Sequence, residues 1–333
     1  LPFFELSRLS DRLPLAQFDV VSFRSFPPRE IINFIFPYFF GNPAQFGGYS
    51  EALLGKVSQD WLLSPYIGII PFLFVFFLVK REKKTLFFLF SALVALIVAF
   101  GRYTPVYTFL YHYLPGVSLI RYPVKYMFLV VFSLTVVAAF NFEGILGMLR
   151  DKAAPLGRYK KVVFSLFMLF FCATAASFIW LGYLDSFIVQ QFGRQLSNSN
   201  IMLLNSLIEF NQISAINIVA FLLVLFFLFR AAERGQIRRG LFAGAILIMT
   251  SADLLANGAS IKIAADAGVF TKAPKSYYLM KKDGRFLYSP ELEQKNRLIY
   301  GETFSEALWN VKDDLCANWH IPFHRFDFYG YES

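Results

Sequence analysis

Six long apolar runs occupy the middle of the chain, and short polar connections separate them. The runs are Trp61–Val79, Thr85–Phe100, Val124–Phe140, Val162–Tyr183, Ile213–Phe229 and Leu241–Ala256. Each comes close to the ~17–25 residues that cross about 30 Å of hydrocarbon as a helix. A lone strand in lipid would leave its backbone groups unpaired, so we expect six transmembrane helices.

The connections between the runs alternate in charge. Lys80–Lys84, Arg150–Lys161 and Arg230–Arg239 together hold thirteen basic and three acidic residues, whereas Gly101–Pro123 holds two bases. Basic turns of this kind stay on the cytoplasmic side of a membrane, so both ends of the chain are expected outside. The formal net charge of +9 therefore reflects topology and does not indicate a nucleic-acid partner.

Composition supports the membrane assignment. The chain is 56% hydrophobic with 42 Phe, and its mean hydropathy is +0.50, which exceeds the usual range of soluble domains. We expect an all-α polytopic membrane protein with a small α+β extracytoplasmic tail. The predicted parts are an outer segment at residues 1–60, a six-helix bundle at 61–256 and the tail at 257–333.

Two further expectations concern the outer segment and the ends. Pro28–Phe40 has a proline in its first turn but is too short to span, which predicts an interfacial or re-entrant helix. The chain opens on Leu1 without a signal-peptide pattern, so we expect that upstream sequence is missing and that the tail is also truncated.

The outer stretch between the second and third runs holds the densest chemistry. Arg102, Arg121 and Lys125 stand there among tyrosines, including Tyr103 and Tyr122. Three bases on this side oppose the positive-inside tendency, which favours an anionic partner such as a lipid phosphate. The alternative is that the bases reach lipid headgroups and the tyrosines form an interfacial belt. Both interpretations stay open on these residues.

Other candidate residues are fewer. Asp253 lies inside the last run, where an acid is either functional, hydrated or bonded to a neighbouring helix. His320 and His324 have the spacing of a helical metal pair, but Pro322 between them disfavours that helix. We therefore expect no metal site, and no motif for nucleotide hydrolysis, serine hydrolysis or dinucleotide binding is found.

Several stretches resemble the bacterial YfhO-like membrane proteins. Residues 101–105 (GRYTP) and 114–125 (LPGVSLIRYPVK) are similar to that family's "GRYTPLY…LPGFSLFRVPARY" region. Residues 36–43 (FPYFFGNP) and 65–71 (PYIGIIP) resemble its "lPyFFGdP" and "YiGilPl" stretches. Ala317-Asn318 and residues 330–333 are similar to its outer "pN…GY.s" stretch. Lys125 stands where the family often has Arg.

The resemblance implies a protein similar to GT-C glycosyltransferases in the bacterial cytoplasmic membrane. Such proteins move a sugar from a polyprenyl-phosphate carrier to an acceptor outside, here an envelope polymer or glycolipid. Arg102, Arg121, Lys125, Tyr103 and Tyr122 would then bind the lipid phosphate, with Asp253, Asn42 and Asn318 as further candidates.

The catalytic residue is not identified by these stretches. The resemblance places the catalytic carboxylate in an outer loop upstream of this sequence, so whether the chain itself is catalytic stays open. It leaves a divalent metal open in the whole protein, although no residue here indicates one. The expected partners are membrane lipid and the lipid-linked sugar, and the alternatives are a lipid-linked-sugar flippase or transporter and a non-catalytic envelope scaffold.

Overall fold

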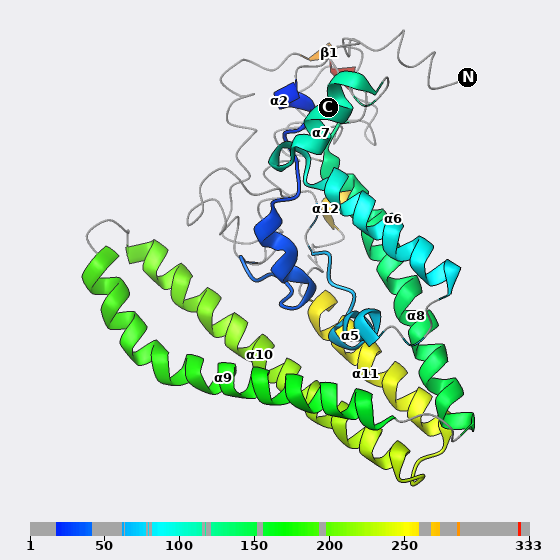
Figure 1. The fold of residues 1–333 in the computed structure, drawn as a ribbon. Coiled ribbons are helices and arrows are strands. Elements are labelled where there is room, and N and C mark those ends of the chain that lie inside the picture. The colour runs from blue at the N-terminus through cyan, green and yellow to red at the C-terminus, as the bar shows by residue number, and fades with distance from the viewer. Residues whose placement is uncertain are drawn as a thin grey trace. The chain divides into compact units, whose positions relative to one another are not determined.

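The computed structural model describes most of the helical part of the chain. The described residues are 18–41, 62, 64–77, 79, 82–114, 117, 121–151, 156–192, 198–259, 268–273, 285–286 and 326–327. The chain divides into two compact units, Leu1–Ile261 and Lys262–Ser333. The first unit carries the long helices, which Figure 1 labels in chain order.

Four helical stretches among the described residues are long and apolar enough to cross a membrane. They are Pro123–Arg150, Gly157–Ile179, Leu207–Glu233 and Arg239–Ala259. They belong to η4 with α8 (Pro123–Tyr126, Met127–Asp151), α9 (Gly157–Phe192), α10 (Asn198–Glu233) and α11 (Arg239–Ala259). These four helices confirm the expectation of a multi-pass helical membrane protein, and they match four of the six predicted spans.

Large apolar side chains cover the outside of these helices. Phe128 of α8, Ile179 of α9 and Ile248 of α11 are between 71% and 72% exposed. In water such a surface would be unusually apolar, whereas in a bilayer it contacts lipid tails. The exposed faces therefore agree with the membrane assignment.

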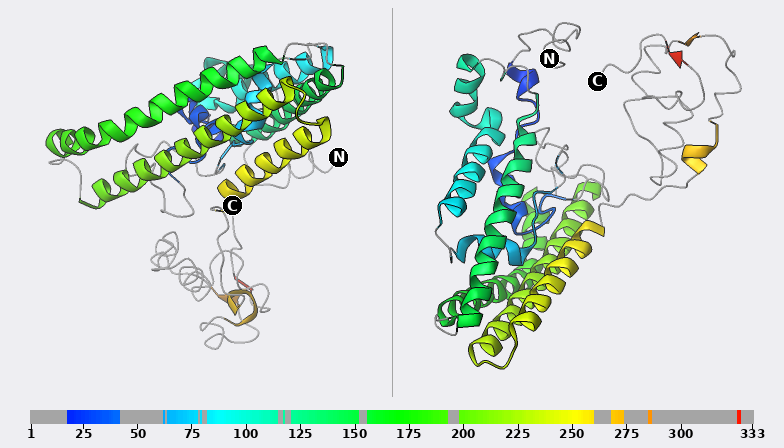
Figure 2. Two further views of the ribbon diagram at one scale, coloured as in Figure 1. Left: turned by 90° about the horizontal axis from the view of Figure 1, so that it is seen from below. Right: turned by 90° about the vertical axis from the view of Figure 1, so that its right-hand side faces the viewer.

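The fourth and fifth predicted runs are parts of much longer helices. α9 and α10 each have 36 residues, about 54 Å at about 1.5 Å per residue. They pack against each other, as the two views in Figure 2 also show. The stretch Leu184–Gln212, whose few charges are typical of an outer connection, is therefore mostly helical. Because polar residues are scattered through it, the apolar pattern does not show that the helices continue beyond their apolar runs.

The first predicted span contains a much shorter helix, and the second agrees closely with the helix found there. In place of Trp61–Val79 the structure has α5 over Ile69–Phe77, only 9 residues. Pro71 has no N–H and is tolerated only in the first turn of a helix, so it fixes the start near Ile69. α6 (Lys83–Ala99) has 17 residues, about 26 Å at about 1.5 Å per residue. α6 packs along α8.

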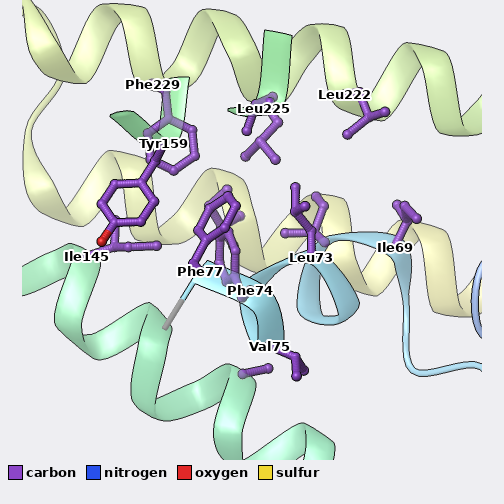
Figure 3. Packing of buried hydrophobic residues seen from close by; sticks show 14 of the residues in the cluster. Ile69, Leu73, Phe74, Val75, Phe77, Ile145, Tyr159, Leu222, Leu225 and Phe229 are labelled. Carbon is purple, nitrogen blue, oxygen red and sulfur yellow. The ribbon is translucent and has the colours of Figure 1, made fainter. Parts of the chain in front are cut away.

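α5 lies in the centre of the bundle. It contacts α8, α10 and α11, and Phe74 and Phe77 are 2% and 9% exposed. Phe77 lies between Tyr159 of α9 and Phe229 of α10, with ring centroids 5.0 and 6.1 Å away. Figure 3 shows this apolar cluster, with side chains from α5 pointing toward the surrounding long helices. α5 is therefore a short buried helix that the longer helices enclose.

The chain just after α5 is held by a polar side chain of α8. The backbone N–H of Val79 donates to Oδ1 of Asn141 at 2.9 Å, and Asn141 is fully buried. Asn141 lies ten residues before Asp151, the end of α8, which is about 15 Å along the helix. The chain after α5 therefore leaves the core well before the level at which α8 ends.

The two basic turns that follow α8 and α10 meet at one end of the bundle. Lys160 at the start of α9 forms an ion pair with Glu233 at the end of α10. α10 then closes with Gly235 at a φ of 68°, and the N–H groups of Gly235 and Gln236 donate to Ala232 and Ala231. This is a Schellman motif, which glycine favours because of its positive φ.

The outer segment and the linker between α6 and α8 form short helices. They are α2 (Phe18–Val21), η1 (Pro28–Phe34), η2 (Gly101–Tyr103) and α7 (Pro105–Tyr113). The helix predicted over Pro28–Phe40 is thus a 3-10 helix that ends before Pro37. A second apolar cluster joins Phe26 and Phe34 to Ala95, Ala99 and Met127, which packs the outer segment onto α6 and α8.

The second unit has few described residues. They form α12 (Gly268–Thr271) and two strands, β1 (Arg285–Phe286) and β2 (Phe326–Asp327). The strands pair in parallel, with Arg285 opposite Phe326. The rest of the predicted α+β tail lies outside the described residues.

Candidate functional site

The segment at residues 18–26 joins the two ends of the candidate outer stretch. Its backbone binds the start of α8, because the N–H groups of Tyr122 and Val124 donate to the carbonyls of Val21 and Arg24, both at 3.0 Å. At the other end, the Phe26 N–H donates to the Ala99 carbonyl at 2.8 Å. The segment therefore bridges the end of α6 and the beginning of α8.

Gly101 allows this close approach. It has a φ of +50°, and a Cβ at this position would lie 2.0 Å from Ser25 Oγ and 2.9 Å from Pro123 Cγ. Ser25 Oγ accepts a hydrogen bond from the Arg102 N–H at 3.0 Å and donates to the Ser22 carbonyl at 2.7 Å. Only a glycine fits here, because a side chain would displace the bridging segment.

Tyr122 carries two cationic side chains on its ring. The guanidinium carbon of Arg24 lies 5.1 Å from the ring centroid, and Lys125 Nζ lies 5.2 Å from it. Both distances fall within the range of cation–π contacts. Tyr122 also has a φ of 68°, which is rare for a residue with a bulky side chain. Its strained backbone is held by the hydrogen bond to Val21.

Arg102 points toward the backbone of the bridging segment. Its Nε donates to the Ser22 carbonyl at 3.0 Å, and Nη2 donates to the Asp19 carbonyl at 3.1 Å. These carbonyls lie at the end of α2, where a cation is favoured. Arg102 thus stabilises the segment that carries Arg24, and much of its hydrogen-bonding capacity is already used.

The start of α8 differs from what the sequence indicates. Pro123 in the first turn suggests free N–H groups facing a ligand, but the Val124 N–H donates to Arg24 and the Lys125 N–H donates to Tyr122. These backbone contacts satisfy both donors. An anion in this region would therefore bind to charged side chains and not to the backbone N–H groups of the helix N-terminus.

Two tyrosines of the outer stretch, Tyr103 and Tyr107, stay protonated at neutral pH. Burial raises the pKa of Tyr103, against the smaller opposing effect of Arg102 and Arg29. Burial also raises the pKa of Tyr107 to about 12, and Tyr107 is 1% exposed. Both groups are therefore neutral hydrogen-bond donors at neutral pH, and neither is a base.

The sequence-predicted residues do not all gather in one place. Tyr122 and Lys125 are in contact, and the half-buried Arg121 precedes Tyr122 in the chain. Arg102, which Tyr103 follows, bonds the bridging segment at Asp19, Ser22 and Ser25. Arg24 was not among the predicted residues, because nothing near it in the sequence resembles a site. Asn42 and Asn318 lie outside the described residues, and those that are described include no metal-binding group of His, Cys, Asp or Glu.

Asp253 lies in a different place and is surrounded by donors. It is 3% exposed, and its carboxylate accepts from the Tyr66 hydroxyl at 2.8 and 2.9 Å. It also accepts from the Ile69 N–H and from Asn257 Nδ2, both at 2.9 Å. Because Ile69 is the first residue of α5, Asp253 caps that helix from α11. Of the alternatives for this acid, the structure shows a helix partner.

Comparisons with known proteins complete the description of the site. No family model, curated protein or solved structure matches the chain.

Proposed function

We propose that the protein belongs to a bacterial YfhO-like, GT-C-type membrane machinery that binds a polyprenyl-phosphate-linked sugar. In this proposal the six apolar runs become four crossings of the cytoplasmic membrane by α8, α9, α10 and α11, with α5 and α6 entering it as a shorter hairpin and both ends outside. The basic turns at Arg150–Lys161 and Arg230–Arg239 support that orientation, because they lie at the same end of the bundle.

The observation that carries the proposal is the group of cations around Tyr122. Arg24 and Lys125 come from separate segments and meet on one ring, and Arg121 precedes it directly. We define Arg24, Arg121 and Lys125 as the outer basic cluster. Guanidinium groups bind phosphate oxygens bidentately, and a lysine adds a point charge. A cluster of this composition at the start of a membrane-spanning helix suits a lipid phosphate or diphosphate.

The cluster would contribute to sugar transfer by charge stabilisation. When the sugar leaves its carrier, negative charge increases on the departing phosphate, and fixed cations lower the energy of that transition state. A carboxylate elsewhere in the complete protein would deprotonate the acceptor hydroxyl. Arg102 would act as a positioning residue, because it holds the carbonyls of the segment that presents Arg24.

The test is neutralisation of the cluster in the complete protein. Arg24→Gln or Arg121→Gln should lower transfer from a lipid-linked sugar about tenfold to a hundredfold, which corresponds to about 1.5–3 kcal/mol for a charge-assisted contact. Lys at either position should restore activity only in part, because it lacks the planar fork. The matched control is Arg158→Gln, an exposed arginine at the basic end of α9, which should retain activity.

One outcome would remove the proposal. If the double variant Arg24→Gln, Arg121→Gln transfers sugar at the normal rate while its membrane level is unchanged, the cluster only contacts headgroups.

A second candidate is a flippase or transporter for the lipid-linked sugar. α5 favours it, because short, interrupted helices inside a bundle are common at transporter binding sites. Reconstituted vesicles distinguish the two: a transporter moves the lipid-linked sugar across the bilayer without an acceptor, and a transferase does not.

A further inference from the structure

A small polar cleft lies beside Asp253, away from the outer basic cluster. Its wall comes from the loop after η1, the chain before α5, and the facing sides of α10 and α11. The lining residues are Pro37, Tyr66, Ser214, Asn217, Ile218, Phe221, Asp253 and Asn257. Polar groups from three separate segments thus converge within the helical bundle, which is costly in a membrane unless they serve a purpose.

The cleft lies toward the end of the bundle opposite the basic turns. Asp253 and Asn257 follow Arg239, the first residue of α11, by 14 and 18 residues, which is about 21 and 27 Å along the helix. With about 30 Å of hydrocarbon, Asn257 is near the far interface and Asp253 is somewhat deeper. The cleft therefore lies nearer the side that the charge pattern assigns to the outside.

The described lining of the cleft disfavours ionic ligands. It includes no Lys, Arg or His, so an anion would find no counter-charge among these residues. The one acid, Asp253, already accepts from Tyr66, Ile69 and Asn257, and these donors together with the start of α5 compensate its charge. A cation would have to displace them.

The remaining polar groups are neutral, and most of their donors are already used. Tyr66, Ser214, Asn217 and Asn257 carry hydroxyl and amide groups, and Ser214 is 8% exposed. Tyr66 and Asn257 donate to Asp253, and Ser214 Oγ donates to the Phe210 carbonyl at 3.1 Å. The oxygens of Tyr66 and Ser214 can each accept a further hydrogen bond.

Ile218 and Phe221 supply an apolar wall beside these groups. The cleft holds about 10 Å³ of space for the centre of a water molecule, which is room for one water or one hydroxyl group. Acceptor oxygens next to an apolar wall match a hydroxyl group on a carbon skeleton, which donates to them.

We infer that this cleft is a binding site for a hydroxyl group of a neutral, hydroxyl-rich ligand. Water fills it otherwise. The oxygens of Tyr66 and Ser214 accept from the hydroxyl, while Asp253 orients Tyr66 and is a positioning residue. Asn217 lies in the wall beside them. The inference is independent of the outer basic cluster and of transferase activity, because it rests on the cleft alone.

The experiment measures thiol labelling at the cleft in the membrane-embedded full chain. Asn217→Cys is introduced after Cys172 and Cys316 are replaced by Ser, and a hydrophilic, impermeant thiol reagent is added from outside. The matched control is Ile216→Cys, because Ile216 is the neighbouring residue of α10 and is 47% exposed on an apolar face. Labelling at 217 should be about tenfold faster, since apolar surroundings suppress the reactive thiolate at 216.

Ligand protection then identifies the chemistry. Glycerol or glucose, at a concentration equal to its Kd for the cleft, should slow labelling at 217 by about twofold. Potassium phosphate and betaine at equal osmolarity should leave the labelling rate unchanged. Tyr113→Cys, at a position that is 74% exposed at the end of α7, reports any general effect of the solutes and should label at a constant rate.

Three results would overturn the inference. Equal labelling at 216 and 217 means that the cleft does not admit water. Protection by phosphate alone means an anion site. Labelling at 217 that no hydroxyl-rich solute slows means that the cleft holds water only. None of these results depends on the transfer activity by which the outer basic cluster is tested.

Discussion

Two polar regions of this membrane protein use charge in opposite ways. At the cap of α5, a single buried carboxylate accepts hydrogen bonds from a phenol, a backbone N–H and an amide, all within 2.9 Å. In the outer basic cluster, two cations from separate segments share one aromatic ring at just over 5 Å. The first charge accepts hydrogen bonds from donors around it, whereas the second group brings two cations onto one ring.

The difference separates architecture from recognition. A buried charge is tolerated when donors surround it, and it then fixes the elements that supply those donors. Like charges brought together repel each other, and a ligand of opposite charge can offset that repulsion. By this comparison Asp253 holds the fold together, and the outer basic cluster is the site at which we propose that a lipid phosphate binds.

The strongest test of the comparison is removal of the Asp253 carboxylate. Asp253→Ala leaves three buried donors without their acceptor, so we expect a loss of about 3–6 kcal/mol in the free energy of unfolding. Tyr66→Phe removes one donor and should cost about 1 kcal/mol. Thermal unfolding in detergent measures both effects.

The neighbouring position supplies the control. Leu254→Ala truncates a side chain that is 40% exposed, and it should change stability little because that face contacts lipid or detergent. If Asp253→Ala unfolds at the wild-type temperature, the carboxylate is not architectural and a ligand role for it returns.

The next test concerns the close contact that positions the outer basic cluster. Gly101→Ala would place a Cβ 2.0 Å from Ser25 Oγ at a positive φ, which should destabilise the protein by about 2–4 kcal/mol through strain and overpacking. Transfer activity should fall with it, because Arg24 moves with the displaced segment. The readouts are thermal unfolding and activity of the complete protein.

A second glycine gives the matched comparison. Gly147 lies in α8, and a Cβ there would meet nothing within 4 Å. Gly147→Ala should therefore stabilise the helix by about 0.5–1 kcal/mol. Equal effects of the two substitutions would show that the contact at Gly101 is loose.

The sequence predicted what depends on long stretches of one kind of residue. The runs that become α8, α9, α10 and α11 are apolar enough to be recognised without tertiary context. The pattern failed to predict the helix in the first run, Trp61–Val79. The residues of that run are apolar because they are buried in the protein, so the length of the run does not give the length of the helix. Pro71 marks the actual start of α5, and could have been used to limit that helix.

The contacts between distant residues could not be predicted from the sequence. Asp253 and Tyr66 are 187 residues apart, and nothing local shows that one caps the helix next to the other. Arg24 and Tyr122 meet only because Gly101 allows the segment at 18–26 to approach α8. The motif around Arg102 and Arg121 directed attention to this region, but pairing between segments determines which side chains gather there.

The smallest expected effect concerns a third kind of charge, the ion pair at the basic end of the bundle. The Lys160 and Glu233 side chains are 27% and 37% exposed, so water screens their attraction and the pair should contribute no more than about 1 kcal/mol. A double-mutant cycle with Lys160→Met and Glu233→Gln, measured by unfolding in detergent at low and high salt, isolates that value. A coupling energy well above 1 kcal/mol, or one insensitive to salt, would contradict this expectation. The pair would then resemble the buried Asp253 contact, and exposure would not be the property that distinguishes the charges of this protein.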